Sequence, residues 1–162
     1  MDKAEKMYLD VLQSGEQEAR SEARAQPVRS AYAAGLSASQ LVNLYRNEGR
    51  LKDAEAIVRR VLEVQTATLG ERHRAIVQTL TALADIYAEE ANREPAKLAD
   101  ARATYERAIA MQEANMGADY PSVGDLLHRY ADFLSQSNDP AKAAEVKARI
   151  ASIEAHQPKT SK

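Results

Sequence analysis

Three residues in the last third of the sequence have side chains that could bind a metal ion. Asp125, His128 and Asp132 stand at positions i, i+3 and i+7, so in a helix all three could face the same way. Imidazole and carboxylate groups are common metal ligands. However, their spread along a helix makes it awkward for them to bind one small ion, and no cysteine or second histidine assists. The sequence therefore predicts no metal site and no cofactor.

Other residues that could do chemistry also lack the partners they would need. No serine lies in a nucleophile elbow, and no phosphate-cradling glycine loop follows a strand pattern. His73 fits a linker position near a helix start, and His156 lies in a polar tail. We therefore expect a protein that is not an enzyme.

The basic residues do not form a surface for nucleic acid. The 22 Lys and Arg residues are mixed along the chain with 24 Asp and Glu residues, and the formal net charge is −2. Arg59, Arg60 and the run at 72–74 are interrupted by acids and have no interleaved aromatic residues. We therefore expect no nucleic-acid partner.

The sequence also has no segment that predicts a membrane location. It contains no run of about 20 apolar residues, the length that a membrane span needs. The first residues, with charges at Asp2, Lys3, Glu5 and Lys6, do not form a signal peptide. We expect a soluble, cytoplasmic protein without membrane partners, although a domain whose leader had been removed would look the same.

A fixed spacing between small residues recurs along the chain. Ala54 lies sixteen residues before Gly70, and Ala101 lies sixteen before Gly117. The matching upstream blocks align Leu41 with Leu83 and Tyr130, and Tyr45 with Tyr87 and Leu134. From Gly70 to Gly117 is 47 residues, which becomes 42 when a five-residue insertion near EANREPAKLA is removed. A recurring period of this length indicates a repeat architecture.

Each repeat has the pattern of a pair of helices. Ala38, Leu41, Val42 and Tyr45 fall at i, i+3, i+4 and i+7, which is one stripe of an α-helix. Small residues at Ala54, Ala101 and Ala143 let the two helices of a pair approach closely. Gly49 and Asn138 fit the left-handed turn between helices, and Gly70 and Gly117 fit helix ends. The sequence therefore predicts an all-α solenoid of stacked antiparallel helix pairs with about seven helices.

These blocks resemble the tetratricopeptide repeat. The small-Leu-small pattern with Leu-Tyr and a turn glycine carries the resemblance, and the segments GERHRAIVQTL and GADYPSVGDLL look like the linker of the kinesin-light-chain type. The resemblance covers residues 28 to 156. Arg74 where proline is typical, Tyr120 in place of histidine, and the insertion after Tyr87 depart from the pattern.

The expected organisation is an incomplete repeat followed by three complete ones. Residues 1–26 resemble a second helix and a connector, 28–70, 71–117 and 118–156 are repeats, and 157–162 form a disordered tail. Lys147 in the last helix replaces Val58 and Tyr105 of the earlier repeats, as expected of a polar capping helix. The first segment leaves Met7, Tyr8 and Val11 without a partner helix, so upstream repeats, a second copy of the chain, or residues 14–26 folded back could cover them.

The resemblance also implies where a ligand would bind. In tetratricopeptide arrays the first helices line a concave groove that suits an extended peptide or a partner helix. The candidate peptide-binding residues at the equivalent positions are Asn43, Arg46, Asn47, Asp85, Glu89, His128, Arg129 and Asp132. The carboxylate clamp of the chaperone-binding members is not expected, because Ser39, Ala82 and Asp125 stand at three of its five positions. The groove is instead expected to be of mixed or acidic charge, with some of its charges paired to each other.

Two functions remain open from the sequence. The first is an adaptor or scaffold module that binds a peptide or helix of a protein partner in its groove. The second is a structural or self-associating end segment of a longer solenoid, which pairs as a homodimer through Met7, Tyr8 and Val11 and leaves the groove unused.

Overall fold

The computed structural model describes residues 6, 9–10, 13 and 27–156. These residues contain helices and turns and no strand, which confirms the predicted all-α solenoid. The helices are α2 (Pro27–Asn47), α3 (Leu51–Leu69), α4 (Arg74–Ala91), α5 (Lys97–Met116), α6 (Pro121–Gln136) and α7 (Pro140–His156). Met7, Tyr8 and Val11, the predicted self-association residues, lie outside the described residues, and so does the predicted disordered tail at 157–162.

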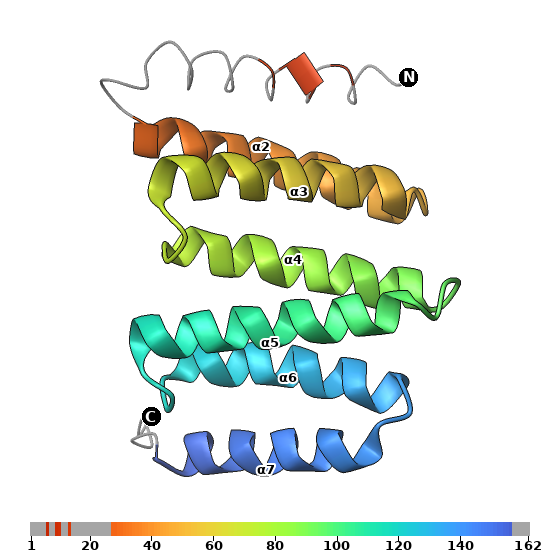
Figure 1. The fold of residues 1–162 in the computed structure, drawn as a ribbon, viewed down its shortest axis with the longest axis vertical. Helices are drawn as coiled ribbons and strands as arrows, with labels where there is room; N and C mark the ends of the chain where they lie inside the picture. The colour runs from red at the N-terminus through yellow and green to blue at the C-terminus, as the bar shows by residue number, and fades with distance from the viewer. Residues whose placement is uncertain (1–5, 7–8, 11–12, 14–26, 157–162) are drawn as a thin grey trace, which may run out of the picture.

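The helices stack as three antiparallel hairpins, α2–α3, α4–α5 and α6–α7 (Figure 1). The second helix of each hairpin then packs against the first helix of the next, α3 on α4 and α5 on α6. The small residues at the helix crossings are fully enclosed, since Ala54 and Ala101 have no exposed surface. Tyr45 and Tyr87 are buried in the same continuous core, as the apolar stripe predicts.

The turn residues adopt the left-handed backbone that the sequence predicts. Gly49 and Asn138, between the helices of the first and third hairpins, have φ of 70° and 58°. Gly70 and Gly117 end α3 and α5 with φ of 82° and 97°. Residues with a Cβ rarely adopt these angles, so the four positions fix where the chain reverses.

The inserted residues lengthen the end of the second hairpin. Two residues separate Asn47 from Arg50, whereas seven separate Glu89 from Lys97, the residues at the equivalent positions. Part of the extra length continues α4 to Ala91, and the rest forms a wider connector to α5.

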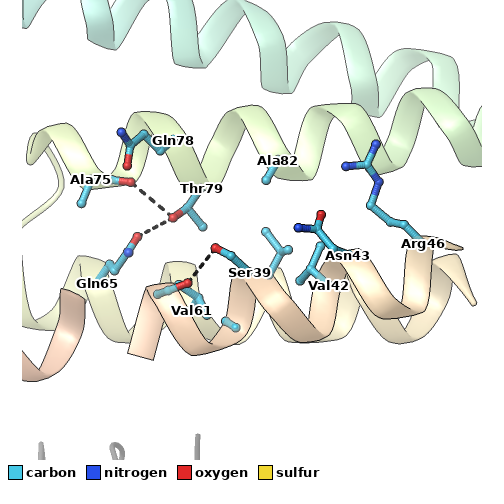
Figure 2. A pocket seen from close by; sticks show the side chains of 13 residues that line it. Ser39, Val42, Asn43, Arg46, Val61, Gln65, Ala75, Gln78, Thr79 and Ala82 are labelled. Carbon is cyan, nitrogen blue, oxygen red and sulfur yellow. Dashed lines mark hydrogen bonds between the residues drawn. The ribbon is translucent and has the colours of Figure 1, made fainter. Parts of the chain in front are cut away.

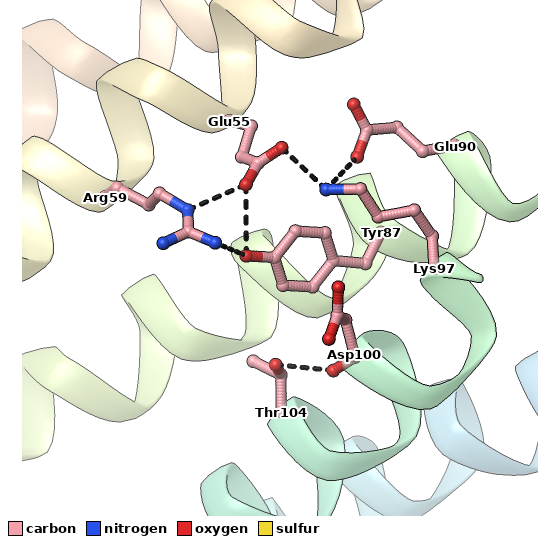
Figure 3. Close-up of polar contacts among 7 residues, drawn as sticks. All are labelled: Glu55, Arg59, Tyr87, Glu90, Lys97, Asp100 and Thr104. Atoms are coloured by element: carbon pink, nitrogen blue, oxygen red, sulfur yellow. Dashed lines mark hydrogen bonds and ion pairs between the residues drawn. The ribbon is translucent and has the colours of Figure 1, made fainter. Parts of the chain in front are cut away.

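A partly buried charge network joins α3, α4 and α5 around Tyr87 (Figure 3). The Lys97 ammonium lies 2.9 Å from Glu55 Oε2, 3.2 Å from Glu90 Oε2 and 4.6 Å from the centre of the Tyr87 ring. Burial alone would lower the pKa of Lys97, but its hydrogen bonds to Glu55 and Glu90 raise it. Because Glu55 belongs to the first hairpin and Lys97 to the second, the network holds the two hairpins in register.

Candidate binding groove

Two cavities open along the side of the stack formed by α2, α4 and α6. The smaller, which we call the N-terminal pocket, has a volume of about 210 Å³ and lies between α2, α3 and α4 (Figure 2). The larger, the C-terminal pocket, has a volume of about 730 Å³ and is lined by α2, α4, α5 and α6. The two pockets form one groove, because four residues line both of them: Arg46, Ala75, Gln78 and Ala82.

Ion pairs between helices tie together several charged side chains of the groove. Asp85 of α4 accepts hydrogen bonds from Arg129 Nη1 of α6 at 2.6 Å and from Tyr105 Oη of α5 at 2.5 Å. Arg46 of α2 donates from Nε to Glu89 Oε1 of α4 at 3.1 Å, and also from Nη2. The hydrogen bond to Glu89 raises the pKa of Arg46, although burial opposes it. These contacts link the first helices of all three hairpins.

The lining of the C-terminal pocket is of mixed charge. Its charged residues are three arginines and two aspartates: Arg46, Arg74, Arg129, Asp85 and Asp125. Asp85 and Glu89 already form ion pairs with arginines of the same chain. The groove therefore does not present a line of unpaired acidic side chains, which the sequence alone could suggest.

The structure brings together some of the predicted peptide-binding residues. Arg46, Asp85 and Arg129 line the C-terminal pocket, and Asn43 lines the N-terminal pocket. Glu89 lines neither pocket but holds Arg46 in place. Contact of any of these residues with a partner stays a prediction.

Three other predicted residues lie away from both pockets. The His128 Nε2 atom is 3.3 Å from Glu154 Oε1 of α7, so this side chain faces the third hairpin's second helix. Asp132 and Asn47 are exposed and line neither pocket. Asp125, His128 and Asp132 also do not gather as a metal site, and no group of three metal-ligating side chains occurs in the described part of the chain.

Sequence reasoning missed an apolar patch at the mouth of the C-terminal pocket. Met116 and Tyr120 are 44% and 46% exposed, and they are the two large hydrophobic side chains with such exposure among those whose burial the structure describes. Both line the C-terminal pocket. They lie on either side of Gly117 and Asp119, between α5 and α6, and the sequence marks Tyr120 only as a departure from the repeat pattern. The available signal was the presence of two large apolar side chains beside a solvent-facing turn.

Sequence reasoning also missed the polar wall of the N-terminal pocket. Gln65 of α3 is 4% exposed, and its Oε1 atom accepts a hydrogen bond from Thr79 Oγ1 of α4 at 2.6 Å (Figure 2). Ser39 Oγ donates to the Gly35 carbonyl at 2.8 Å. In sequence, Gln65 reads as an ordinary polar residue of an amphipathic helix, and only the packing of α4 against α3 encloses it.

The comparison with protein families identifies repeats in the first part of this fold. Residues 32–99 match the sequence profile described as tetratricopeptide repeat. No curated protein matches the chain. No described helix has both the length and the hydropathy that crossing a bilayer requires.

The fold is similar to solved repeat structures. One is a Q17M variant of nearly identical TPR-like repeats, from a Podosopora anserina protein assigned as a kinesin light chain; it has 21% identity and a TM-score of 0.64, over 91% of this chain and 67% of that one. Another structure of such repeats from the same organism has 19% identity and a TM-score of 0.63, over 97% of this chain and 76% of that one. Together these matches confirm the predicted resemblance to tetratricopeptide repeats of the kinesin-light-chain type.

Proposed function

We propose, from the membership of residues 32–99 in the tetratricopeptide repeat family and from the shape of the groove, that this chain is an adaptor module. It binds a peptide or helix of a partner protein along α2, α4 and α6, and it performs no catalysis. Tetratricopeptide repeats in general serve as protein-interaction modules, and the specific use of this groove is our proposal.

The observation that carries the proposal is the apolar patch at the groove mouth. Met116 and Tyr120 expose nearly half of their surface beside a cavity of about 730 Å³. Exposed large apolar side chains next to a concavity are typical of binding surfaces. The rest of the cavity offers hydrogen-bonding groups, among them Thr81 and Gln112. A partner segment with an apolar residue at its anchor and polar groups along its length fits this surface.

The contribution of the patch can be estimated from its area. Covering the exposed half of one such side chain removes roughly 80–100 Å² from water, which is worth about 2 kcal/mol at about 25 cal/mol per Å². Loss of one anchor contact should therefore weaken binding about 30-fold.

The test is selection of short random peptides on the full chain, followed by fluorescence anisotropy with the selected sequences. We expect Met116→Lys and Thr81→Arg, which alter the groove, to weaken binding by about 30-fold or more. The matched control is Glu63→Lys, which changes an exposed residue of α3 that lines neither pocket. Equal binding by the two groove variants and the control would refute the groove as the binding surface.

The same preparation tests the alternative function. Light scattering after size exclusion would detect a dilution-resistant dimer, and polar substitution of Met7, Tyr8 and Val11 would dissociate it. A dimer of this kind, together with no selected peptide that depends on the groove, would favour the structural, self-associating function.

A further inference from the structure

We propose that the N-terminal pocket is a specificity subsite that receives an uncharged carboxamide side chain, of the asparagine or glutamine type, from the bound partner. This inference rests on the proposed function, because it assigns one position of the peptide that the groove binds. The cavity of about 210 Å³ has the scale of one side chain, given that a water molecule occupies about 30 Å³.

The central feature of the subsite is a buried amide with unused donors. Gln65 is 4% exposed and lines the pocket. Its carbonyl oxygen is occupied by Thr79, but its Nε2 atom has no acceptor among the described residues. Nε2 lies toward Gly35, another residue of the pocket lining, since a Cβ added there would be 3.2 Å from it. A ligand oxygen that reaches Nε2 would form a hydrogen bond shielded from water.

The second hairpin provides an internal comparison. Gln112 stands 47 residues after Gln65, at the equivalent position of α5. Its Nε2 atom donates to Ser122 Oγ at 2.5 Å, so its amide is already used within the chain. The free amide of Gln65 is therefore a property of the first junction and not of the repeat in general.

Gly35 keeps the first junction open next to this amide. A Cβ at Gly35 would lie 3.2 Å from Gln65 Nε2, and the equivalent residue in α4 is Val77. Glycine inside a helix is less favourable than alanine by roughly 0.5–1 kcal/mol. Its presence here has no turn or positive φ to explain it, since the positive-φ glycines are Gly49, Gly70 and Gly117. The missing side chain instead leaves room beside the amide.

The remaining lining selects an uncharged group. Asn43 and Gln78 place neutral amides at the exposed mouth of the pocket. Ser39 Oγ donates its hydrogen bond to the Gly35 carbonyl, so its lone pairs can still accept one from a ligand. Among the lining residues that the structure describes, Arg46 is the charged one, and it is paired with Glu89. A carboxylate or an ammonium would therefore be desolvated without a free counter-charge.

An apolar side chain would also fit this pocket less well than a carboxamide. It would leave the Gln65 Nε2 donors unpaired. A carboxamide can accept from Gln65 and donate to Ser39, so it matches both sides of the pocket.

The experiment uses peptides selected on the full chain and measures their preference at each position. We expect one position at which replacing a carboxamide residue with leucine weakens binding about tenfold, and replacing it with glutamate weakens it further. Gln65→Met should remove this preference, while Thr79 keeps the Ala75 carbonyl as an acceptor at 3.3 Å. Glu63→Met, which changes an exposed residue of α3 that lines neither pocket, is the control and should keep the preference.

Gly35→Ala is a second variant, and it tests the subsite even if the Gln65→Met protein does not fold. It should leave thermal stability unchanged or raise it, and it should reduce the carboxamide preference, because the new methyl group presses on the amide. Groove-dependent binding with no carboxamide preference, or a preference that survives both Gln65→Met and Gly35→Ala, would overturn the subsite alone. Failure to select any groove-dependent peptide would overturn the proposed function and the subsite with it.

Discussion

Replacing Lys97 with methionine should destabilise the protein by about 3 kcal/mol. The Lys97 side chain is 17% exposed, and its ammonium contacts the carboxylates of Glu55 and Glu90. Removing one member of a buried ion pair costs roughly 3–5 kcal/mol, because the remaining charge stays buried and uncompensated. We expect the lower end of this range, since Glu55 keeps Arg59 at 2.7 Å and the Tyr87 hydroxyl at 3.2 Å.

The variant should also weaken the pH dependence of this region. In the wild type, burial would raise the pKa of Glu55, but hydrogen bonds from Lys97, Arg59 and Tyr87 lower it below its ordinary 4.5. A lowered folded-state pKa gives stability that is present above the unfolded value and is lost as pH falls through the folded one. Without Lys97, Glu55 loses one of the hydrogen bonds that lower its pKa. The variant should therefore lose less stability than the wild type as pH falls through the acid range.

Urea unfolding followed by far-ultraviolet circular dichroism measures both effects. The control is the double variant Glu90→Met with Lys97→Met, which removes the stranded carboxylate and should recover most of the lost stability. Two results would refute the conclusion that these ion pairs stabilise the packing of the first two hairpins. One is a loss of unfolding free energy below about 1 kcal/mol for Lys97→Met, and the other is a double variant no more stable than the single one.

Three further predictions concern the turns and the tyrosines. Gly70→Ala should cost roughly 1–3 kcal/mol in urea unfolding through backbone strain alone, because φ is 82° with ψ of 157° and nothing lies within 4 Å of the added Cβ. Tyr105→Phe should cost about 1 kcal/mol in the same assay, because Asp85 loses one hydrogen bond and keeps Arg129. Burial, together with hydrogen bonds to carboxylates, raises the pKa of Tyr105 and of Tyr130. Stability from these two phenols should therefore hold below the ordinary tyrosine value of about 10 and fall at higher pH, and ultraviolet titration should show them ionising only on unfolding.

The fold could be predicted because the residues that determine it act on nearby residues and recur in each repeat. Tyr45 and Tyr87 occupy the same place in successive apolar stripes, and both are buried. Gly49 and Asn138 adopt the left-handed backbone that their types favour. Each of these features is decided within a few residues, so periodicity and residue type suffice to predict it.

The candidate site could be predicted only in part, because it depends on contacts between hairpins. The positions of Arg46, Asp85 and Arg129 along their helices indicate the correct face, and the structure places all three in one pocket. Their pairing partners depend on how closely α2, α4 and α6 approach. The position of His128 along its helix does not predict where its side chain lies, because the side chain contacts Glu154 of α7 instead of facing the groove.

Two ion pairs between helices limit which ligands the groove can select by charge. The contacts Arg46 to Glu89 and Arg129 to Asp85 join α2 to α4 and α4 to α6, so a charged ligand could recruit either arginine only by weakening a contact between neighbouring hairpins. At these two arginines such a ligand would gain little net energy, because it exchanges one ion pair for another. Preference among partners should therefore come mainly from groups that the described chain leaves unused, such as the exposed faces of Met116 and Tyr120 and the amide of Gln65. It follows that raising the salt concentration should weaken binding of a selected peptide much less than removing its apolar anchor does.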